Sequence, residues 1–333
     1  MTREALDKAV APRSLSRTAF GLSPWEAVPW LVAFAAFFLF PGYVPLFGQI
    51  IVMTLFALSL DIVVGYCGIV TLGHAALYGT GAYTAGLLAV HGWTEPISNA
   101  ICATLVAALA GFLTGAVILR AHGFITVMLT LAVTVTFYEI ANHTDKWTGG
   151  DDGLKGIDMS PLLGRFEFDI YGDTAFFYCL AVLFLALVLV RLLVNSPFGW
   201  SLRGIRENIG RMHAIGCPVY RRLLQAYTIA AGLAGLAGAL QAQTTQYVAL
   251  RALSFDLSGD VLIMLIIGGI GRLYGAFIGV PLYLLAQDEL ATRDAANWYF
   301  WMGILLIVIV LFARGGILAL AGRLGEILAR RRA

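Results

Sequence analysis

Three carboxylates stand within long apolar stretches of the sequence: Asp61, Glu139 and Asp260. An ionised side chain at the centre of a bilayer costs about 2.5–3.5 kcal/mol on insertion scales, so each carboxylate should have a partner or face a cavity. Carboxylates of this kind hold coupling ions in secondary transporters and line the pores of channels. For Asp61 a second interpretation stays open, because it also lies near the end of its apolar segment, close to the expected membrane interface.

Other residue types that carry chemistry show no catalytic or metal-binding spacing. No HExxH, haem-pair, Ser–His or paired-aspartate arrangement occurs among the histidines and the apolar segments, and no GxxxxGK[ST] phosphate loop is present. The histidines are His74, His91, His122, His143 and His213. The cysteines lack a CxxC pair and are interpreted as reduced and structural: Cys67, Cys102, Cys179 and Cys217. We therefore expect no enzymatic activity, no metal and no cofactor.

The segment from Gly65 to Thr84 combines several glycines with polar side chains in an apolar region. A lipid-facing helix has no use for this composition, whereas a broken or re-entrant helix beside a pathway does, because unwound backbone is tolerated there only against protein or water. For His74 an interhelical hydrogen bond is favoured over a ligand role. We expect the translocation pathway to include these residues: Asp61, Gly65, Gly68, Thr71, Gly73, His74 and Tyr83.

A short amphipathic helix is predicted within residues 195–222. Ser196 can cap its start with Pro197 at the first helical position, and Gly216 with Pro218 ends it. Apolar residues repeat at helical spacing on one face: Phe198, Leu202, Ile205 and Ile209. Charged residues occupy the other: Arg203, Arg206 and Glu207. Such a helix either lies in the membrane interface or docks into a groove on a partner.

The composition places all of these residues in an all-α polytopic membrane protein. Hydrophobic residues make up 59% of the 333 positions and charged residues 13%, with mean hydropathy +0.83, whereas soluble domains carry about 25% charged residues. The segments 258–271 and 275–290 are short, and they form either two full spans or one hairpin that does not cross the membrane. We predict about ten (8–10) spans, within these apolar segments: 27–47, 48–66, 68–90, 98–119, 124–142, 174–194, 223–244, 258–271, 275–290 and 298–318.

Small residues four apart suggest how these spans pack. Gly111 with Gly115 is one such set, and the longer ones are Ala231–Gly235–Ala239 and Gly271–Gly275–Gly279. Small side chains let helix backbones approach closely in lipid, where no hydrophobic gain drives association. Plain bundle packing is the favoured explanation, and sliding helices of an alternating-access transporter are the other.

The distribution of basic residues sets the orientation. With both termini cytoplasmic, ten spans place 17 of the 22 Lys and Arg residues on the cytoplasmic side. This arrangement predicts a cytoplasmic tail (1–26), a transmembrane permease domain (27–318) and a basic cytoplasmic tail (319–333). The acidic loop 143–173 is then external, and could serve as a docking surface for a soluble partner, while 195–222 is cytoplasmic.

The sequence resembles the LivM-type permeases of branched-chain amino-acid ABC importers from about residue 50 to 318. The order and spacing of several blocks carry the resemblance: Gly65–Ala75, Gly81–Tyr83, Thr148–Leu154, Ser196–Gly199, Ile205–Asn208, Ala234–Ala239 and Gly268–Gly271. Members commonly have Asn at the position of Asp61, and this chain also departs from the family at Ile69–Thr71 and Ile209–Met212. Relatives import urea, short amides or aromatic acids, so the resemblance does not identify the transported solute.

The resemblance implies a non-enzymatic subunit with a type II-like ABC importer permease bundle in a bacterial inner membrane. Its partners would be a second related permease, two cytoplasmic ATP-binding subunits that hydrolyse ATP, and a periplasmic solute-binding protein, with no nucleic acid. It makes residues 198–216 the helix that couples ATPase motion to the bundle, through Phe198, Gly199, Arg203, Ile205, Arg206, Glu207, Asn208 and Gly216. An ion-coupled secondary transporter or channel is the alternative, and an intramembrane enzyme is the least favoured interpretation.

Overall fold

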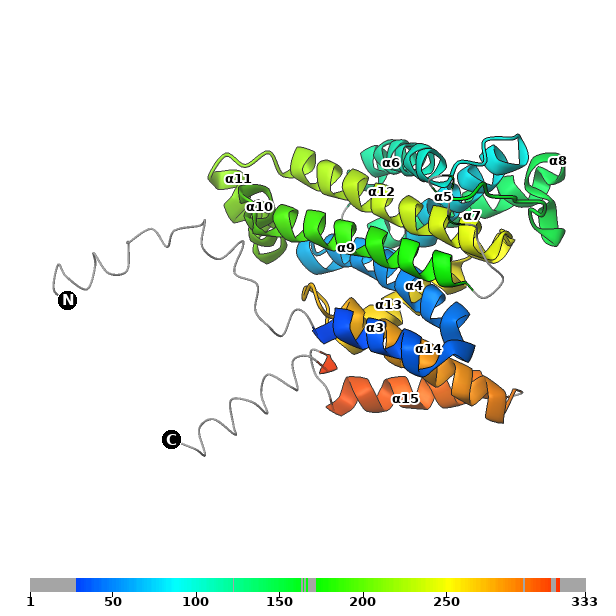
Figure 1. Ribbon diagram of the computed structural model, residues 1–333. Helices are drawn as coiled ribbons and strands as arrows, with labels where there is room; N and C mark the ends of the chain where they lie inside the picture. Colours follow the sequence, from blue (N-terminus) through cyan, green and yellow to red (C-terminus); the bar gives the residue numbers. More distant parts are fainter. Residues whose placement is uncertain are drawn as a thin grey trace, which may run out of the picture.

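The computed structural model describes residues 28–121, 123–162, 164, 166, 172–295, 297–312 and 316–317. The predicted tails 1–26 and 319–333 lie outside these residues. The described chain is helical, with two isolated β-bridges and no named strand (Figure 1). The prediction of an all-α protein is therefore confirmed.

Each of the ten predicted apolar segments corresponds to one helix. These are α3 (Val28–Leu39), α4 (Val44–Asp61), α5 (His74–Val90), α6 (Pro96–Ile118), α7 (Phe124–His143), α9 (Asp173–Asn195), α12 (Val219–Thr245), α13 (Phe255–Gly268), α14 (Ala276–Arg293) and α15 (Trp298–Phe312). Shorter elements occupy the connections: α8 (Asp145–Thr148), α10 (Pro197–Glu207), α11 (Ile209–Ala214), 3₁₀ turns at Pro41–Tyr43, Gly150–Asp152 and Leu250–Leu253, and a π-helical stretch at Ile62–Tyr66.

Two predicted boundaries were wrong. The first two helices are separated at Pro41–Tyr43 rather than at residues 47 and 48, because Pro41 starts a 3₁₀ turn that interrupts the apolar run. The third helix begins at His74 rather than at residue 68, since residues 67–73 form no helix. Hydropathy alone does not detect either break, because both lie within apolar sequence.

Helix α4 is the centre of the bundle. From Ile51 to Asp61 every residue is buried, and it packs against α9, α12, α13 and α14. Helices α5, α6 and α12 form the tightest group on one side of it, and α3, α14 and α15 lie on the other (Figure 1). A helix that is apolar on all faces belongs in the interior of a bundle, which explains why α4 shows little sidedness in its sequence.

Small residues of α6 and α12 allow this close packing, as predicted for two of the three sets, Gly111 with Gly115 and Ala231–Gly235–Ala239. A Cβ on Gly235 would overlap Ala107 of α6, and one on Gly111 would overlap Ala231. The third set is confirmed in part: Gly275, the residue before α14, and Gly279 inside it lie against the end of α13, whereas Gly271 lies in the turn between the two helices.

Five helices in the described part of the chain are long and apolar enough to cross a membrane: Pro41–Tyr66, Pro96–Ile118, Phe124–His143, Asp173–Asn195 and Val219–Thr245. Helices α3 and α15 are apolar but shorter. Helix α13 has 14 residues, about 21 Å at 1.5 Å per residue, which is less than the roughly 30 Å of hydrocarbon. The chain is thus a multi-pass membrane protein in which helices of full and partial length pack together.

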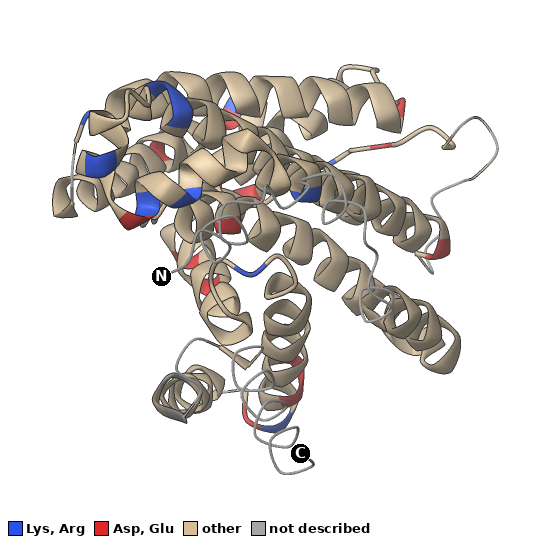
Figure 2. Cartoon of the chain, turned by 90° about the vertical axis from the view of Figure 1, so that its left-hand side faces the viewer, with Lys and Arg blue, Asp and Glu red and all other residues tan. Residues whose placement is uncertain are grey.

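The two ends of the bundle differ in charge. Helices α10 and α11 lie at one end and α8 at the other (Figure 1). Viewed from the end that carries α10 and α11, most of the coloured basic residues gather around these short helices (Figure 2). We call this end the basic end; that it faces the cytoplasm stays a prediction of the positive-inside rule.

Candidate functional site

A cavity of about 230 Å³ lies toward the end opposite the basic end, which we call the cavity end. It forms where the start of α4, the end of α12 and the connection after α12 meet α5, α13 and α14. Its polar lining residues are Gln49, Tyr78, Gln241, Thr245, Tyr247, Arg251, Asp260 and Gln287. Its apolar lining residues include Met53, Ala82, Val248, Leu257, Met264 and Leu284. Polar and apolar residues thus contribute about equally to the lining, and a concave site with both kinds of surface can hold and orient a small molecule.

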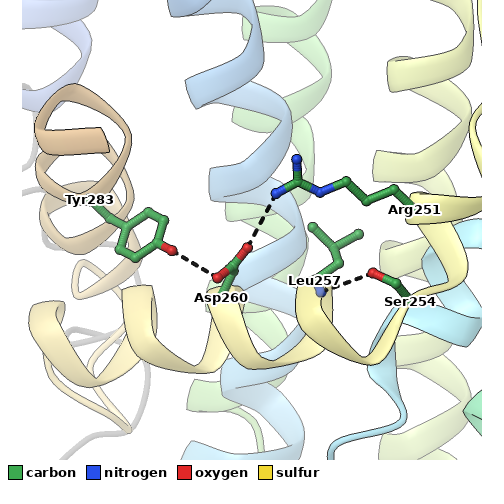
Figure 3. Close-up of polar contacts among 5 residues, drawn as sticks. All are labelled: Arg251, Ser254, Leu257, Asp260 and Tyr283. Atoms are coloured by element: carbon green, nitrogen blue, oxygen red, sulfur yellow. Dashed lines mark hydrogen bonds and ion pairs between the residues drawn. The ribbon is translucent and has the colours of Figure 1, made fainter. Parts of the chain in front are cut away.

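One oppositely charged pair lies in this lining (Figure 3). Arg251 Nη2 is 3.6 Å from Asp260 Oδ2, and the Tyr283 hydroxyl donates to Asp260 Oδ1 at 2.8 Å. The Ser254 hydroxyl accepts the backbone N–H of Leu257 at 3.2 Å and so caps α13, the helix that presents Asp260 within its second turn. Three segments thus meet at one carboxylate: the 3₁₀ turn, α13 and α14.

The predicted external loop contacts two residues that line this cavity. Leu154 and Val248 exchange backbone hydrogen bonds of 2.8 and 3.2 Å, and the Tyr247 hydroxyl donates to the carbonyl of Asp152 at 3.1 Å. Gly153 has φ +70°, and a Cβ there would lie 2.6 Å from the Tyr247 hydroxyl, so glycine is required for this approach. The loop therefore fixes Tyr247 and Val248, both of which line the cavity.

The glycine-rich segment contains the predicted break in the helix. After α4 the chain passes through the π-helical stretch Ile62–Tyr66 and then runs without helix to Gly73. The Ile69 N–H donates to the Val63 carbonyl at 3.0 Å, and Gly68 has φ +74°. The unwound backbone is held against protein, as its depth requires.

The side chains around this break make structural contacts. Thr71 accepts the N–H of Gly73 at 3.1 Å, and the next residue, His74, lies 2.9 Å from the Ser59 hydroxyl of α4. The His74 ring also stacks on Phe56 at 5.6 Å between centroids. The interhelical hydrogen bond predicted for His74 is confirmed, and no group of three metal-ligating side chains occurs in the described part of the chain.

At the basic end, contacts converge on a group that we call the inner joint: Asp61, Gly65, Gly68, Arg206 and Gly271. Asp61 is 1% exposed, and its Oδ1 accepts the N–H of Gly271 at 2.7 Å. Arg206 donates through Nη1 to the carbonyl of Gly65. A Cβ on Gly68 would lie 2.9 Å from Arg206 Cγ, and one on Gly271 would lie 2.8 Å from Arg206 Nη1. The joint links α4, α10 and the turn after α13.

Helix α10 is seated on the bundle through its apolar face. Leu202 and Ile205 are 1% and 2% exposed, and a Cβ on Gly199 would overlap the backbone of Val194. Arg203 lies over the rings of Tyr66 and Trp200, both 5.3 Å away, and Phe198 lies under Arg222. The predicted cap is confirmed, because the Ser196 hydroxyl accepts the N–H of Gly199 at 3.4 Å.

The prediction of one helix from 198 to 216 was wrong. Asn208 adopts an extended conformation (φ −159°), ends α10 after Glu207 and caps α11 by accepting the N–H of Arg211 at 2.9 Å. Asparagine favours such a cap over a helix interior. Ile209 is 45% exposed and does not share the buried face of α10. Gly216 follows α11 in a left-handed conformation (φ +81°).

The seven predicted pathway residues do not line the cavity. Asp61, Gly65 and Gly68 belong to the inner joint, Thr71, Gly73 and His74 support the break, and Tyr83 is buried on α5 with no hydrogen-bond partner for its hydroxyl among the described residues. Their place in a pathway stays a prediction. Of the carboxylates in apolar sequence, Asp260 lines the cavity, whereas Glu139 is exposed beside His143. The carboxylate of Asp260 was the only feature of the sequence that pointed to this cavity.

The fold and the site define a class of protein: a helical, multi-pass membrane protein with a cavity toward one end. A family model described as the permease component of branched-chain amino acid transport systems matches residues 42–311. The chain therefore belongs to this family.

The curated relatives are distant and carry two kinds of name. The high-affinity branched-chain amino acid transport system permease protein LivM of Escherichia coli K12 is 28% identical over 78% of this chain and 66% of its own length. The LivM protein of Salmonella typhimurium is 27% identical over 83% and 70%. The autoinducer 2 import system permease protein LsrC of an Enterobacter species is 26% identical over 75% and 70%. No solved structure matches this chain.

Proposed function

We propose that this chain is one of two related membrane-spanning subunits of an ATP-driven importer in a bacterial inner membrane. It passes a small solute, a branched-chain amino acid or a related polar molecule, that a periplasmic binding protein delivers. Two cytoplasmic ATP-binding subunits supply the energy. The family match over residues 42–311 and the names of the relatives support the transport role.

The observation that carries the ATP-driven part is the seating of α10 at the basic end. Its buried face holds it on the bundle, while Trp200, Arg206 and Glu207 remain exposed there. Arg206 also donates to the Gly65 carbonyl in the inner joint. Movement of a partner against the exposed face of α10 is therefore transmitted to both the break after α4 and the turn after α13. This is the arrangement that a helix coupling a partner to the bundle needs.

The test is purification of the tagged chain from its native host, followed by uptake in proteoliposomes. We expect two ATP-binding subunits to co-purify with the unmodified chain, and uptake to depend on ATP. The variant Arg206→Ala/Glu207→Ala should lose both properties. Arg211→Ala/His213→Ala is the matched control, because both side chains are exposed on α11 at the same end.

Two results would contradict the proposal. One is normal ATPase association and normal uptake in the Arg206→Ala/Glu207→Ala variant. The other is uptake by the chain without ATPase subunits, driven by a proton or sodium gradient, which would make it a secondary transporter. The single variant Glu207→Arg separates docking from folding, because Glu207 is exposed and lies outside the inner joint.

A further inference from the structure

We propose that Arg251 and Asp260 form a solute-binding subsite that exchanges their mutual ion pair for the two opposite charges of a zwitterionic solute. Arg251 would take the solute carboxylate and Asp260 its ammonium group. This inference rests on the proposed transport function, because it assigns the residues that hold the transported molecule.

The charge of the cavity lining is the first argument. Arg251 and Asp260 are the charged residues among those that line it, and they come from different elements, the 3₁₀ turn Leu250–Leu253 and α13. The cavity is therefore neutral overall but strongly polar at one place. An anionic or a cationic solute would leave one of the two charges without a counter-charge. A zwitterion satisfies both.

The openness of the pair is the second argument. The side chain of Arg251 is 59% exposed and that of Asp260 is 16% exposed, with 3.6 Å between Nη2 and Oδ2. The exposed partner is Arg251, and its Nη2 lies beyond ordinary hydrogen-bond distance of the carboxylate, so the guanidinium can turn away from Asp260 while staying hydrated. The guanidinium carries five donors and the carboxylate about four acceptor sites, so both keep free capacity for a ligand. Arginine is also suited to bidentate contact with a carboxylate.

The third argument is that the carboxylate is positioned independently of Arg251. Tyr283 donates to its Oδ1 from α14, and Ser254 caps the helix that carries it (Figure 3). Asp260 therefore keeps its place when Arg251 turns to a solute. A carboxylate held only by the arginine would lose its orientation in the exchange.

The remaining lining fits the rest of such a solute. Met53, Leu257, Met264 and Leu284 supply apolar surface, and methionine adapts to side chains of different shape. Tyr78 also lines the cavity; it is 1% exposed, and its hydroxyl lacks a hydrogen-bond partner among the described residues.

The experiment measures binding of radiolabelled L-leucine to the transporter complex in nanodiscs, with two competitors. The competitor 2-hydroxy-4-methylpentanoate lacks the ammonium group, and leucinamide lacks the carboxylate. We expect each to compete about 10- to 100-fold more weakly than leucine, which corresponds to one lost charge-assisted hydrogen bond.

Two neutralising variants make the test specific for each charge. In Asp260→Asn the discrimination between leucine and the hydroxy acid should disappear, while leucinamide stays a weak competitor. In Arg251→Gln the discrimination against leucinamide should disappear instead. A residue that only supports the fold would weaken all three probes by the same factor. Arg293→Gln is the matched control, because Arg293 pairs with Glu289 at 2.5 Å at the same end and does not line the cavity.

A second measurement keeps the pair intact in case a neutralised variant does not fold. None of the cysteines Cys67, Cys102, Cys179 and Cys217 lines the cavity. In Gln287→Cys, leucine should slow labelling by a membrane-impermeant thiol reagent added from outside, and leucinamide and the hydroxy acid should not.

The proposal is overturned if leucine gives no protection, or if both variants affect all three probes equally. Either result leaves the proposed function standing when ATPase subunits still co-purify and ATP still drives uptake. Loss of those two properties in the unmodified chain would instead remove the proposed function.

Discussion

At the cavity end Asp260 is contacted by two side chains, Arg251 and Tyr283, whereas at the inner joint Asp61 contacts the backbone of Gly271. The degree of burial differs in the same way. Asp260 has a 16% exposed side chain, and Asp61 is 1% exposed. Side-chain contacts at an open cavity can be exchanged for contacts with a solute. Backbone contacts in a closed site instead fix the distance between segments.

Glycine makes the second kind of site possible. A Cβ on Gly65 would overlap Asp61 Oδ1 and lie 2.7 Å from the backbone nitrogen of Gly271. The inner joint thus has no room for a side chain, while the cavity has room for a small solute. We infer that the cavity end is built for recognition and the inner joint for transmission of movement, and four substitutions examine this difference.

Gly65→Ala should have the largest effect, because its methyl group must displace Asp61 or the turn at Gly271. Overpacking of this kind costs about 1–3 kcal/mol, and uptake should fall by more than about tenfold as the joint is forced apart. Gly48→Ala is the matched control, since Gly48 lies on α4, which continues into the π-helical stretch that holds Gly65, and no atom lies within 4 Å of an added Cβ there. Thermal stability in detergent and uptake are measured together, and equal behaviour of the two variants would contradict the role of the joint.

Asp61→Leu should come next. It leaves the buried N–H of Gly271 without its acceptor, at a cost of about 1–3 kcal/mol. Asp61→Asn keeps an acceptor at Oδ1, and the other oxygen, Oδ2, has no hydrogen-bond partner among the described residues, so we expect little loss of stability. The midpoint of thermal unfolding distinguishes the two. If Asp61→Asn destabilises as much as Asp61→Leu, the negative charge and not the hydrogen bond holds the joint.

The helices were predictable because their signals are local. An apolar stretch of sufficient length predicts a span wherever it lies, and the Ser196–Pro197 pair marks the start of α10 without reference to the fold. The break at Asn208 also has a local signal, because asparagine favours the cap of a helix over its interior. The repeat of apolar residues through Ile209 instead indicated one continuous helix.

The functional sites were less predictable, because they join residues far apart in the chain. Asp61 and Gly271 are 210 positions apart, and Asp260 and Tyr283 belong to different helices. Sequence identified Asp61 and Asp260 as costly carboxylates, but not which one faces a cavity. The glycines of residues 65–73 were correctly recognised as unusual, yet the structure uses them for close backbone contact and not for lining the cavity.

Tyr283→Phe examines the side-chain contacts of the cavity end. Removing the hydroxyl takes away the donor to Asp260 Oδ1, so the carboxylate should be less well oriented and leucine affinity should fall severalfold, with a loss of about 1 kcal/mol. Tyr299→Phe is the control, because Tyr299 is 63% exposed on α15. The competition assay with L-leucine separates the two, and unchanged affinity in Tyr283→Phe would show that Asp260 needs no support from α14.

Ser196→Ala should have the smallest effect, about 1 kcal/mol or less, because it removes one helix cap with a long hydrogen bond of 3.4 Å. The rest of the seating of α10, including Leu202, Ile205 and the Arg206 contact, stays in place. Uptake should therefore be nearly normal at low temperature, and on heating it should fall at a lower temperature than uptake by the unmodified chain. Asn208→Ala, which removes the cap of the exposed helix α11, should change even less. If Ser196→Ala abolished uptake while leaving thermal stability unchanged, the cap itself and not the inner joint would carry the coupling.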